Sequence, residues 1–347
     1  MTSNQQPATS NQQLAHHLMH SPVTRSVLAW ALRSAALLIM AAAMTKLLPA
    51  VEPVGGKTAG EPALLRWKWS PDSEWVAEFH QQVTTDSTFG AKTLRLAIES
   101  RFTQRWLVRS VDAQGAATLQ QSYTKIAVSV DMGMGNTIAF DTDRPANPMG
   151  ESRRLADALQ PLVGPTWTLV VSPRGEVLRL EPSAEAKAAA ELAAKNSVVQ
   201  PLFASDGAIG LVRQAFVPLP EEPVMPGGGW RTSLPWKASF GVGEIAHQYT
   251  YEGIRPQDGS SVAAVRVESR IDAKPGPGKV TKGRELKEQK IVGLMLFDLA
   301  GGMLAESRQT QSLRAESRVR DVPLAAQLSS ELTVTIRKPD AKGSNSP

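Results

Sequence analysis

The chain has 347 residues, with 38 Lys and Arg, 33 Asp and Glu, and no cysteine. The lack of cysteine excludes disulfides, thiolate catalysis and cysteine-based zinc sites, so stability must come from burial of apolar groups. The first fifty residues hold three basic residues and no acid, which leaves 35 basic against 33 acidic residues in the rest of the chain. Such a nearly neutral body does not favour nucleic-acid binding, and we expect no nucleic-acid partner.

The N-terminus has the pattern of an export signal. Arg25 and Arg33 precede an uninterrupted apolar run, Ala35–Met44, in which Ala41–Ala43 supply the small residues that a signal peptidase requires. A retained membrane anchor is the alternative, because the apolar stretch approaches the length of one bilayer crossing. A buried helix is a third reading. Residues 27–50 are therefore predicted to be a signal peptide or an anchor that contacts the membrane, with the body in the periplasm or outside the inner membrane.

The remaining boundaries follow from composition. Residues 1–26 are rich in Gln, Asn, His and Ser without an apolar period, which predicts a disordered head. Residues 51–62 read as a linker and 339–347 as a disordered tail. Residues 63–338 are predicted to form a single β-rich exported domain, because the length suits one large domain and the pattern is continuous.

Alternation of apolar and polar residues predicts mainly strands. In Val262–Asp272 the residues Val265, Val267 and Ile271 share one face, and the charged residues share the other. Thr93–Glu99 and Glu331–Arg337 repeat the pattern. Turn signals separate such runs and indicate antiparallel neighbours; they are Asp112–Gly115, Ser172–Gly175 and Ala300–Gly302.

Helices are predicted only in the middle of the chain. Their candidates are Glu151–Leu162, the Ala-rich Pro182–Lys195, and Asp206–Phe216 with Ile209, Val212 and Phe216 on one stripe. A Pro-rich crossing then leads to Trp230. The predicted fold class is mainly β (α+β): a large curved antiparallel sheet or half-barrel, with the helices packed on one face.

Four elements together are similar to a family of exported bacterial proteins known only as a domain of unknown function. They are the LPxxPV element at Leu219–Val224, the Gly-rich step into Trp230, the pair Tyr249 and Tyr251, and the hairpin Phe297–Gly302. The resemblance spans Leu64 to Arg337. It implies export and a β-rich fold, and no functional residues come with it.

Motifs that suggest chemistry are weak. Ser122 and Lys125 have the SxxK spacing of serine acyl-transferases, but they lie in a run typical of a strand, where residues three apart are expected on opposite faces. Asp131, Asn136, Asp141 and Asp143 offer oxygen ligands at a spacing that fits no standard calcium loop. His80 and His247 are far apart in sequence, and His247 is expected to be a buried histidine with a local hydrogen bond. We expect no metal and no cofactor.

Seven of the eight tryptophans follow residue 60. Trp67 and Trp69 are two apart and are expected to point the same way from one strand. Such residues can form an aromatic patch that contacts sugar, lipid or membrane, or they can pack in the core. Core packing is the favoured interpretation. The remaining body tryptophans are Trp75, Trp106, Trp167, Trp230 and Trp236.

Two segments, 282–290 and 306–320, are polar on both faces of the expected strands. Such strands cannot cover a dry core along their whole length. They could project into solvent as a charged hairpin or line a groove on the concave side of a curved sheet. The projecting hairpin is favoured, because charged edges prevent aggregation between sheets.

These observations favour a non-enzymatic binding protein of the cell envelope that holds an apolar small molecule or an envelope protein partner between sheet and helices. One alternative is a hydrolase that uses carboxylates such as Asp141 and Asp143 or Asp298. A purely structural envelope scaffold is the other.

Overall fold

The computed structural model describes residues 52–54, 60–133, 137–144, 148–196, 215–238, 241–257, 259–274, 285–319 and 322–339. The predicted signal peptide or anchor and residues 206–214 of the third predicted helix lie outside these ranges. Among the helices that are described, none has the length and apolar character needed to cross a membrane.

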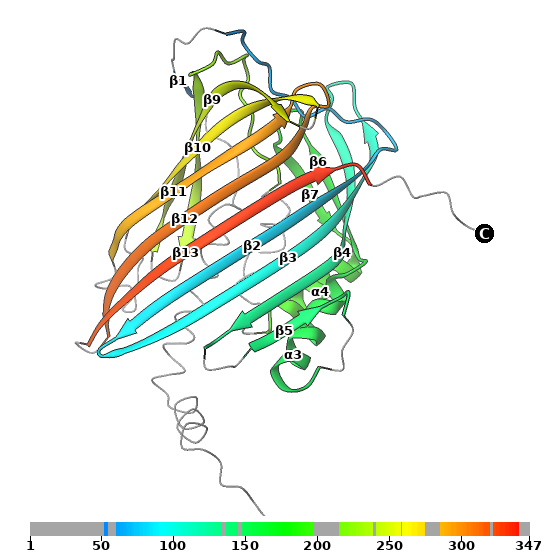
Figure 1. Ribbon diagram of the computed structural model, residues 1–347. Helices are drawn as coiled ribbons and strands as arrows, with labels where there is room; N and C mark the ends of the chain where they lie inside the picture. Colours follow the sequence, from blue (N-terminus) through cyan, green and yellow to red (C-terminus); the bar gives the residue numbers. More distant parts are fainter. Residues whose placement is uncertain are drawn as a thin grey trace, which may run out of the picture.

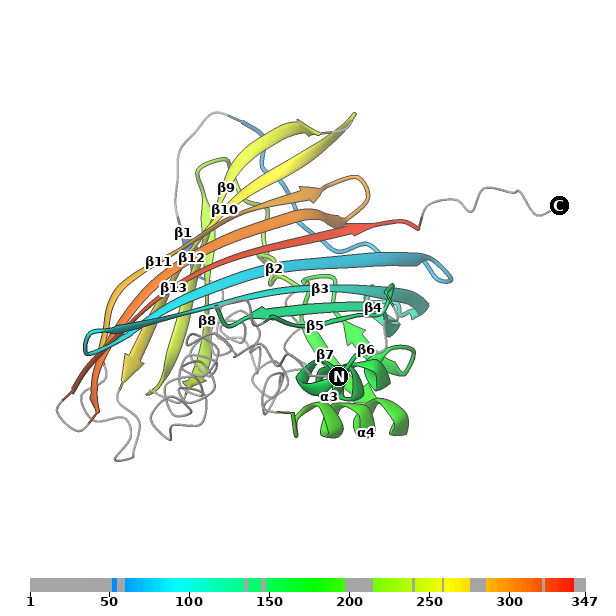
Figure 2. The ribbon, with the colours of Figure 1, turned by 60° about the horizontal axis from the view of Figure 1, so that its bottom comes forward.

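One open, curved antiparallel sheet of thirteen strands dominates the molecule, which confirms the predicted fold class (Figure 1). The strand order is β1-β8-β9-β10-β11-β12-β13-β2-β3-β4-β6-β7, and β5 pairs with a second stretch of β4. Figure 2 shows the sheet arching over two short helices. The strands are β1 (Glu52–Val54), β2 (Glu74–Phe89), β3 (Lys92–Val111), β4 (Ala117–Asp131), β5 (Thr137–Asp141), β6 (Thr166–Val171), β7 (Val177–Pro182), β8 (Gly229–Ala238), β9 (Gly241–Gln257), β10 (Ser260–Lys274), β11 (Glu285–Asp298), β12 (Met303–Val319) and β13 (Val322–Arg337).

The helices α3 (Gly150–Leu159) and α4 (Ala184–Ala193) lie beside β5, β6 and β7, with the short 3-10 helix η2 (Gln160–Leu162) between them in sequence. Both α3 and α4 were predicted from the sequence. The Ser183 hydroxyl caps α4 by accepting a hydrogen bond from the Ala186 N–H (3.1 Å), and Ala186, Ala189 and Ala193 form its buried stripe.

The alternating patterns place apolar residues on an inner face and charged residues on an outer face. Leu96 and Ile98 of β3 are buried, and so are Leu332, Val334 and Ile336 of β13, as predicted. On the outer face, oppositely charged side chains pair across and along strands, as in Arg105–Glu74 (2.5 Å). Exposed pairs of this kind contribute about 0–1 kcal/mol each, so burial on the inner face stabilises the sheet.

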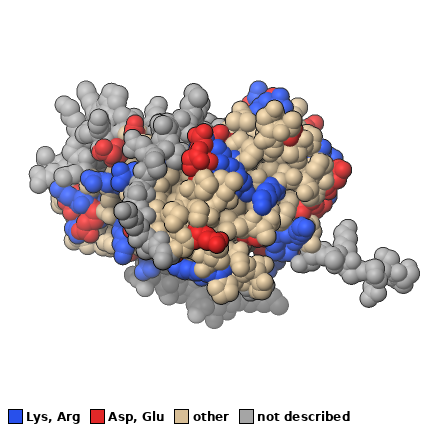
Figure 3. Space-filling model, turned by 90° about the horizontal axis from the view of Figure 1, so that it is seen from above, with Lys and Arg blue, Asp and Glu red and all other residues tan. Residues whose placement is uncertain are grey.

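An extended segment that we call the strap, Ala63–Ser73, closes one end of the curved sheet. Its Trp67 N–H donates to the Pro173 carbonyl in the β6–β7 turn (2.8 Å), and its Lys68 N–H donates to the Gly302 carbonyl in the β11–β12 turn (2.9 Å). Viewed from this end, side chains of both charge signs are interspersed with uncharged ones (Figure 3). The strap thus holds together two turns that are distant in sequence through backbone hydrogen bonds.

An aromatic plug lies beneath the strap. It consists of Trp67, Trp69, Trp106, Phe216 and Phe297, all of which are buried. The Trp67 and Trp69 rings stack with centroids 5.6 Å apart, and Trp106 stacks on Phe216 at 4.9 Å. These contacts confirm that Trp67, Trp69 and Trp106 pack in the core.

Three expectations differ from the structure. Trp67 and Trp69 share one side of the strap, which is not a strand of the sheet. Part of the predicted linker, Glu52–Val54, forms β1 and pairs with β8. The projecting charged hairpin is wrong: β12 pairs along its length with both β11 and β13, and its Gln309 and Gln311 face the interior. The sequence pattern misled because uncharged polar side chains occupy inner positions that usually hold apolar ones.

Gly302 tests the strap contact. It has φ +63°, and a Cβ there would lie 2.3 Å from Lys68 Cγ and 2.7 Å from the Lys68 backbone nitrogen. We expect Gly302→Ala to lower the free energy of unfolding by clearly more than Gly259→Ala, measured by urea denaturation of the full chain. Gly259 is the matched control, because it has φ +80° with no atom within 4 Å of the added Cβ. In Gly259→Ala the free energy of unfolding therefore falls only by the left-handed backbone penalty of about 1–2 kcal/mol. Equal losses would show that the strap contact does not constrain this turn.

Candidate ligand-binding face

The candidate site is the inner face of the sheet. The buried polar residues of the described chain all occupy inner positions, since each pairs across the ladders with buried neighbours. None is Asp, Glu, Lys or Arg. They are Gln81, Thr85, Ser87, Ser100, Gln104, Gln121, Thr232, His247, Gln311 and Ser330. An apolar surface with uncharged polar groups can bury neutral ligands without the large desolvation penalty of an ionised group.

Several of these polar groups have no hydrogen-bond partner. Thr85 Oγ1, Ser87 Oγ, Ser100 Oγ and Gln311 Oε1 are buried and unpaired. Leaving such a group unsatisfied costs about 1–3 kcal/mol. The inner face therefore offers hydrogen bonds that ordered water or the polar atoms of a bound molecule can complete.

His247 lies at the β8–β10 side of this face. Its Nδ1 is 2.7 Å from Ser269 Oγ, and Tyr249 of the same strand stacks on Trp230 with centroids 4.9 Å apart. Burial lowers the pKa of His247 to about 4 and raises that of Tyr249 to about 12. Both side chains are therefore neutral at pH 7, and the expectation of a buried histidine with a local hydrogen bond is confirmed.

A small cavity of about 70 Å³ opens beside His247. Its lining includes Phe216, Tyr249, Met295 and Gln309. The volume admits water or the end of an alkyl chain and is well below the roughly 300–1,000 Å³ that small-molecule pockets usually have.

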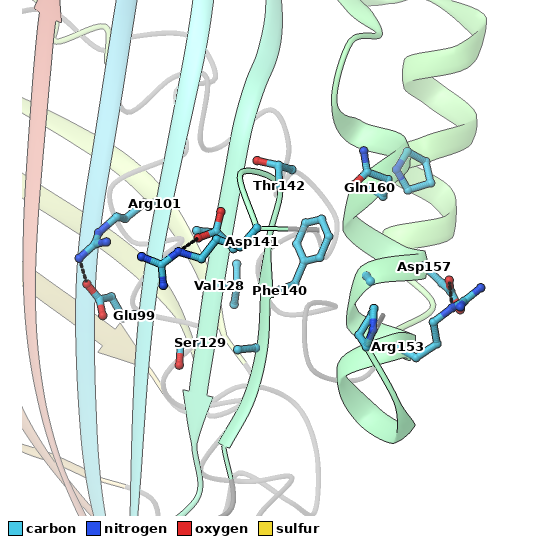
Figure 4. Close-up of a pocket in the computed structure, with 16 residues that line it drawn as sticks. Glu99, Arg101, Val128, Ser129, Phe140, Asp141, Thr142, Arg153, Asp157 and Gln160 are labelled. Atoms are coloured by element: carbon cyan, nitrogen blue, oxygen red, sulfur yellow. Dashed lines mark hydrogen bonds and ion pairs between the residues drawn. The ribbon is translucent and has the colours of Figure 1, made fainter. Parts of the chain in front are cut away.

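A larger pocket of about 760 Å³, which we call the edge pocket, lies among β3, β4, β5 and α3 (Figure 4). Its sixteen lining residues include Glu99, Arg101, Phe140, Asp141, Arg144, Arg153, Ala156 and Asp157. Figure 4 shows the Phe140 ring on the α3 side of β5 and the Asp141 carboxylate on the opposite side. The opposite directions follow from strand geometry, in which successive side chains point to opposite faces.

Three ion pairs line the edge pocket. Arg101 Nη2 lies 2.6 Å from Glu99 Oε1, Arg153 Nε lies 2.9 Å from Asp157 Oδ1, and Arg144 Nε lies 3.8 Å from Asp141 Oδ2. His80 Nε2 also contacts Glu99 (2.9 Å), and this hydrogen bond, followed by the charge of Arg101, lowers the pKa of Glu99. The lining thus carries three cations and three anions, all substantially exposed.

The carboxylates suggested for hydrolysis have other partners. Asp143 pairs with Lys125 (2.7 Å), and Asp141 pairs with Arg144 and accepts a hydrogen bond from the Asp143 N–H (2.9 Å). Asp298 caps its turn by accepting from the Ala300 N–H (2.9 Å). The structure gives Asp298 a turn-forming role and places Asp141 in the lining of the edge pocket.

Ser122 and Lys125 lie on the same face of β4, because a β-bulge at Thr124 shifts the alternation so that Tyr123 and Ile126 are both buried. The expectation of opposite faces is therefore wrong. Catalysis still receives no support, since the hydrogen bond from Lys125 to Asp143 raises the lysine pKa and keeps it protonated. Asp131 caps the turn at Gly133 (2.8 Å), and among the described residues no group of three His, Asp or Glu could hold a metal.

Sequence reasoning missed the edge pocket. Glu99, Asp141 and Asp157 are remote in sequence and meet only because β5 returns beside β4 and α3 follows it. The single local signal was the short interval between Asp141 and the helix, which indicated a tight return.

The depressed pKa of His247 predicts acid sensitivity. Between pH 6.5, its ordinary pKa, and about pH 4, the unfolded chain binds a proton that the folded chain excludes. We expect the free energy of unfolding to fall over this window by up to about 3 kcal/mol from this group, and the fall to be smaller in His247→Gln. Denaturation at pH 7 and pH 4.5 measures it. An imidazole that titrates near its ordinary value by NMR contradicts this prediction.

Comparison with solved structures found similar chains of low identity. A lipovitellin structure described as showing lipid–protein interactions is 10% identical with a TM-score of 0.43; the match covers 80% of this chain, which spans 27% of that one. An outer membrane channel from Pseudomonas putida F1 is 8% identical with a TM-score of 0.22, covering 81% of this chain and 100% of the other.

Comparison with curated proteins found no match. A family model described as a family of unknown function, DUF6263, matches residues 114–290, just over half of the chain. This range includes β4 to β10, the helices and most of the edge-pocket lining, and it confirms the resemblance to a domain of unknown function. The chain belongs to the DUF6263 family of unknown function.

Proposed function

We propose that this chain is a non-enzymatic binding protein of the cell envelope, which holds an apolar or amphipathic small molecule on the inner face of its sheet. The observation that carries the proposal is the composition of that face: among the described residues its buried positions hold no carboxylate, ammonium or guanidinium group, and several hydroxyl and amide atoms there are unpaired. An acyl chain suits the apolar rows, and its ester or hydroxyl groups suit the unpaired atoms.

The plugged end supports a ligand role over a purely structural one. A scaffold needs only the closed core at the strap, where the rings of the aromatic plug stack on one another. The rows away from the strap instead hold Gln81, Ser330 and Gln311. Gln81 Nε2 donates one long hydrogen bond to Ser330 Oγ (3.4 Å), and Gln311 Oε1 has no partner. Buried polar groups weaken a fold unless they form hydrogen bonds, and a bound molecule can supply the missing partners.

Occupancy of this face is the direct test. Native mass spectrometry with lipid extraction, on protein purified from its own envelope without detergent exchange, is expected to find a stoichiometric small molecule. Gln309→Trp places an indole at the small cavity beside His247 on the inner face. We expect it to reduce the affinity of the chain for the co-purified molecule roughly tenfold, equivalent to about 1.4 kcal/mol. Thr310→Trp is the control, because Thr310 is the next residue of β12 and is exposed on the outer face.

A bare protein of chain mass, or equal effects of the two tryptophan variants, would overturn the binding proposal in favour of a scaffold.

The envelope location has its own test. Cell fractionation is expected to recover the body outside the cytoplasm, accessible to protease once the outer layer is permeabilised. The mass of the recovered chain separates a cleaved signal peptide, which shortens the chain after the apolar run, from a retained anchor. Recovery of the chain only in the cytoplasm contradicts the proposal.

A further inference from the structure

The edge pocket reaches both faces of the sheet. Among its lining residues, Val128 and Phe140 occupy inner positions and contribute to the core, whereas Ala139 and Asp141 of β5 occupy outer positions. A pocket bounded by both sets lies where the charged exterior and the apolar inner face adjoin at the rim of the sheet.

We propose that the edge pocket is the mouth through which an amphipathic ligand reaches the inner face, and that its charged rim holds a zwitterionic head group. This inference rests on the proposed function and adds the class of ligand and its route. A volume of about 760 Å³ falls in the range of small-molecule sites, roughly 300–1,000 Å³, so it can hold a head group and the first part of its chains.

Backbone pairing favours this position for a mouth. The described strands from β11 through β13 and β2 to β4 are joined by continuous ladders, which leave no lateral gap. β10 and β11 separate beyond Ser269, but there the Gln289 amide bonds to the Ile271 N–H (2.7 Å) and carbonyl (2.9 Å) and bridges the split. The strap and plug close one end.

The boundary between β5 and α3 has no such ladder. Among the described residues, the hydrogen bond between these two elements is the Ala139 N–H donating to Ser152 Oγ (3.2 Å), and the rest of their contact is packing. Movement of α3 away from β5 breaks this bond and that packing but leaves the pairing of β5 with β4 in place. Widening of the mouth is therefore compatible with an intact sheet.

The charges of the rim favour a zwitterion. Each arginine has a carboxylate partner, and the pairs are exposed: Arg153 and Asp157 retain 64% and 62% of their side-chain accessibility. Such pairs are weak, about 0–1 kcal/mol, so a phosphate can recruit the guanidinium groups while an ammonium group takes the released carboxylate. A head group with only negative charge would meet three carboxylates as well as three arginines.

The route is tested by kinetics. Ala156→Trp places an indole in the edge pocket, and Arg154→Trp is the control on the same helix outside the lining. The probe is phosphatidylcholine with a fluorescent acyl chain, delivered from vesicles to the full chain and followed by stopped flow. We expect Ala156→Trp to slow association roughly tenfold, as about 1.4 kcal/mol added to the barrier requires, and Arg154→Trp to leave it unchanged. Equal association rates in the two variants would overturn the proposal that the ligand enters through the edge pocket.

The head-group class is tested by charge reversal. Asp157→Lys makes the rim cationic, and we expect it to shift preference from phosphatidylcholine towards phosphatidylglycerol with the same acyl chains. Glu191→Lys, on the exposed side of α4 away from the pocket, controls for net charge. Equal shifts in both variants overturn the head-group assignment.

If the wild-type chain binds neither probe, this inference falls. The proposed function falls separately, when native mass spectrometry finds no bound molecule.

Discussion

The fold depends on the pairing of the last strand with the first long one. β13 lies against β2 from Arg337 opposite Val76 to Leu324 opposite Phe89. This ladder joins two sheets that are otherwise separate, β1 and β8 to β12 on one side and β3 to β7 on the other. Because both inner faces need a continuous curve to bury their apolar rows, the ladder creates the enclosed face as well as the sheet.

Burial on that face is a compromise between two physical demands. Apolar side chains contribute roughly 25 cal/mol for each Å² removed from water, which favours a dry core. The hydroxyl and amide groups beside them, such as Ser100 and Gln311, need partners that the described side chains do not supply. At the strap, where aromatic rings fill the space, the first demand dominates. Away from the strap, the two are balanced, and the neutral amphipathic ligand that we propose would satisfy both at once.

Local pattern predicted much of the fold and little of the candidate site. Alternation identified segments of β3, β10 and β13, and turn residues such as Asp112 and Asp298 marked the hairpins they cap. The β2–β13 ladder could not be read, because no short-range signal specifies pairing between strands more than two hundred residues apart. The polar character of β12 was visible, but its place in the middle of the sheet depends on that pairing. The bulge at Thr124 likewise reversed the face of Lys125, and no glycine in the sequence marks its position.

The position of β2 has a consequence for how the chain matures. The strap and β2 are made early, but their partners, the Gly302 turn and β13, come near the C-terminus. Until then, one edge of β2 keeps its backbone donors and acceptors open, and Trp67 lacks the ring of Phe297. Unpaired edges and uncovered indoles are the features that lead nascent chains to aggregate. In this chain the open edge of β2 finds its partner only when the last strand is made, and loss of that strand leaves the edge unpaired permanently.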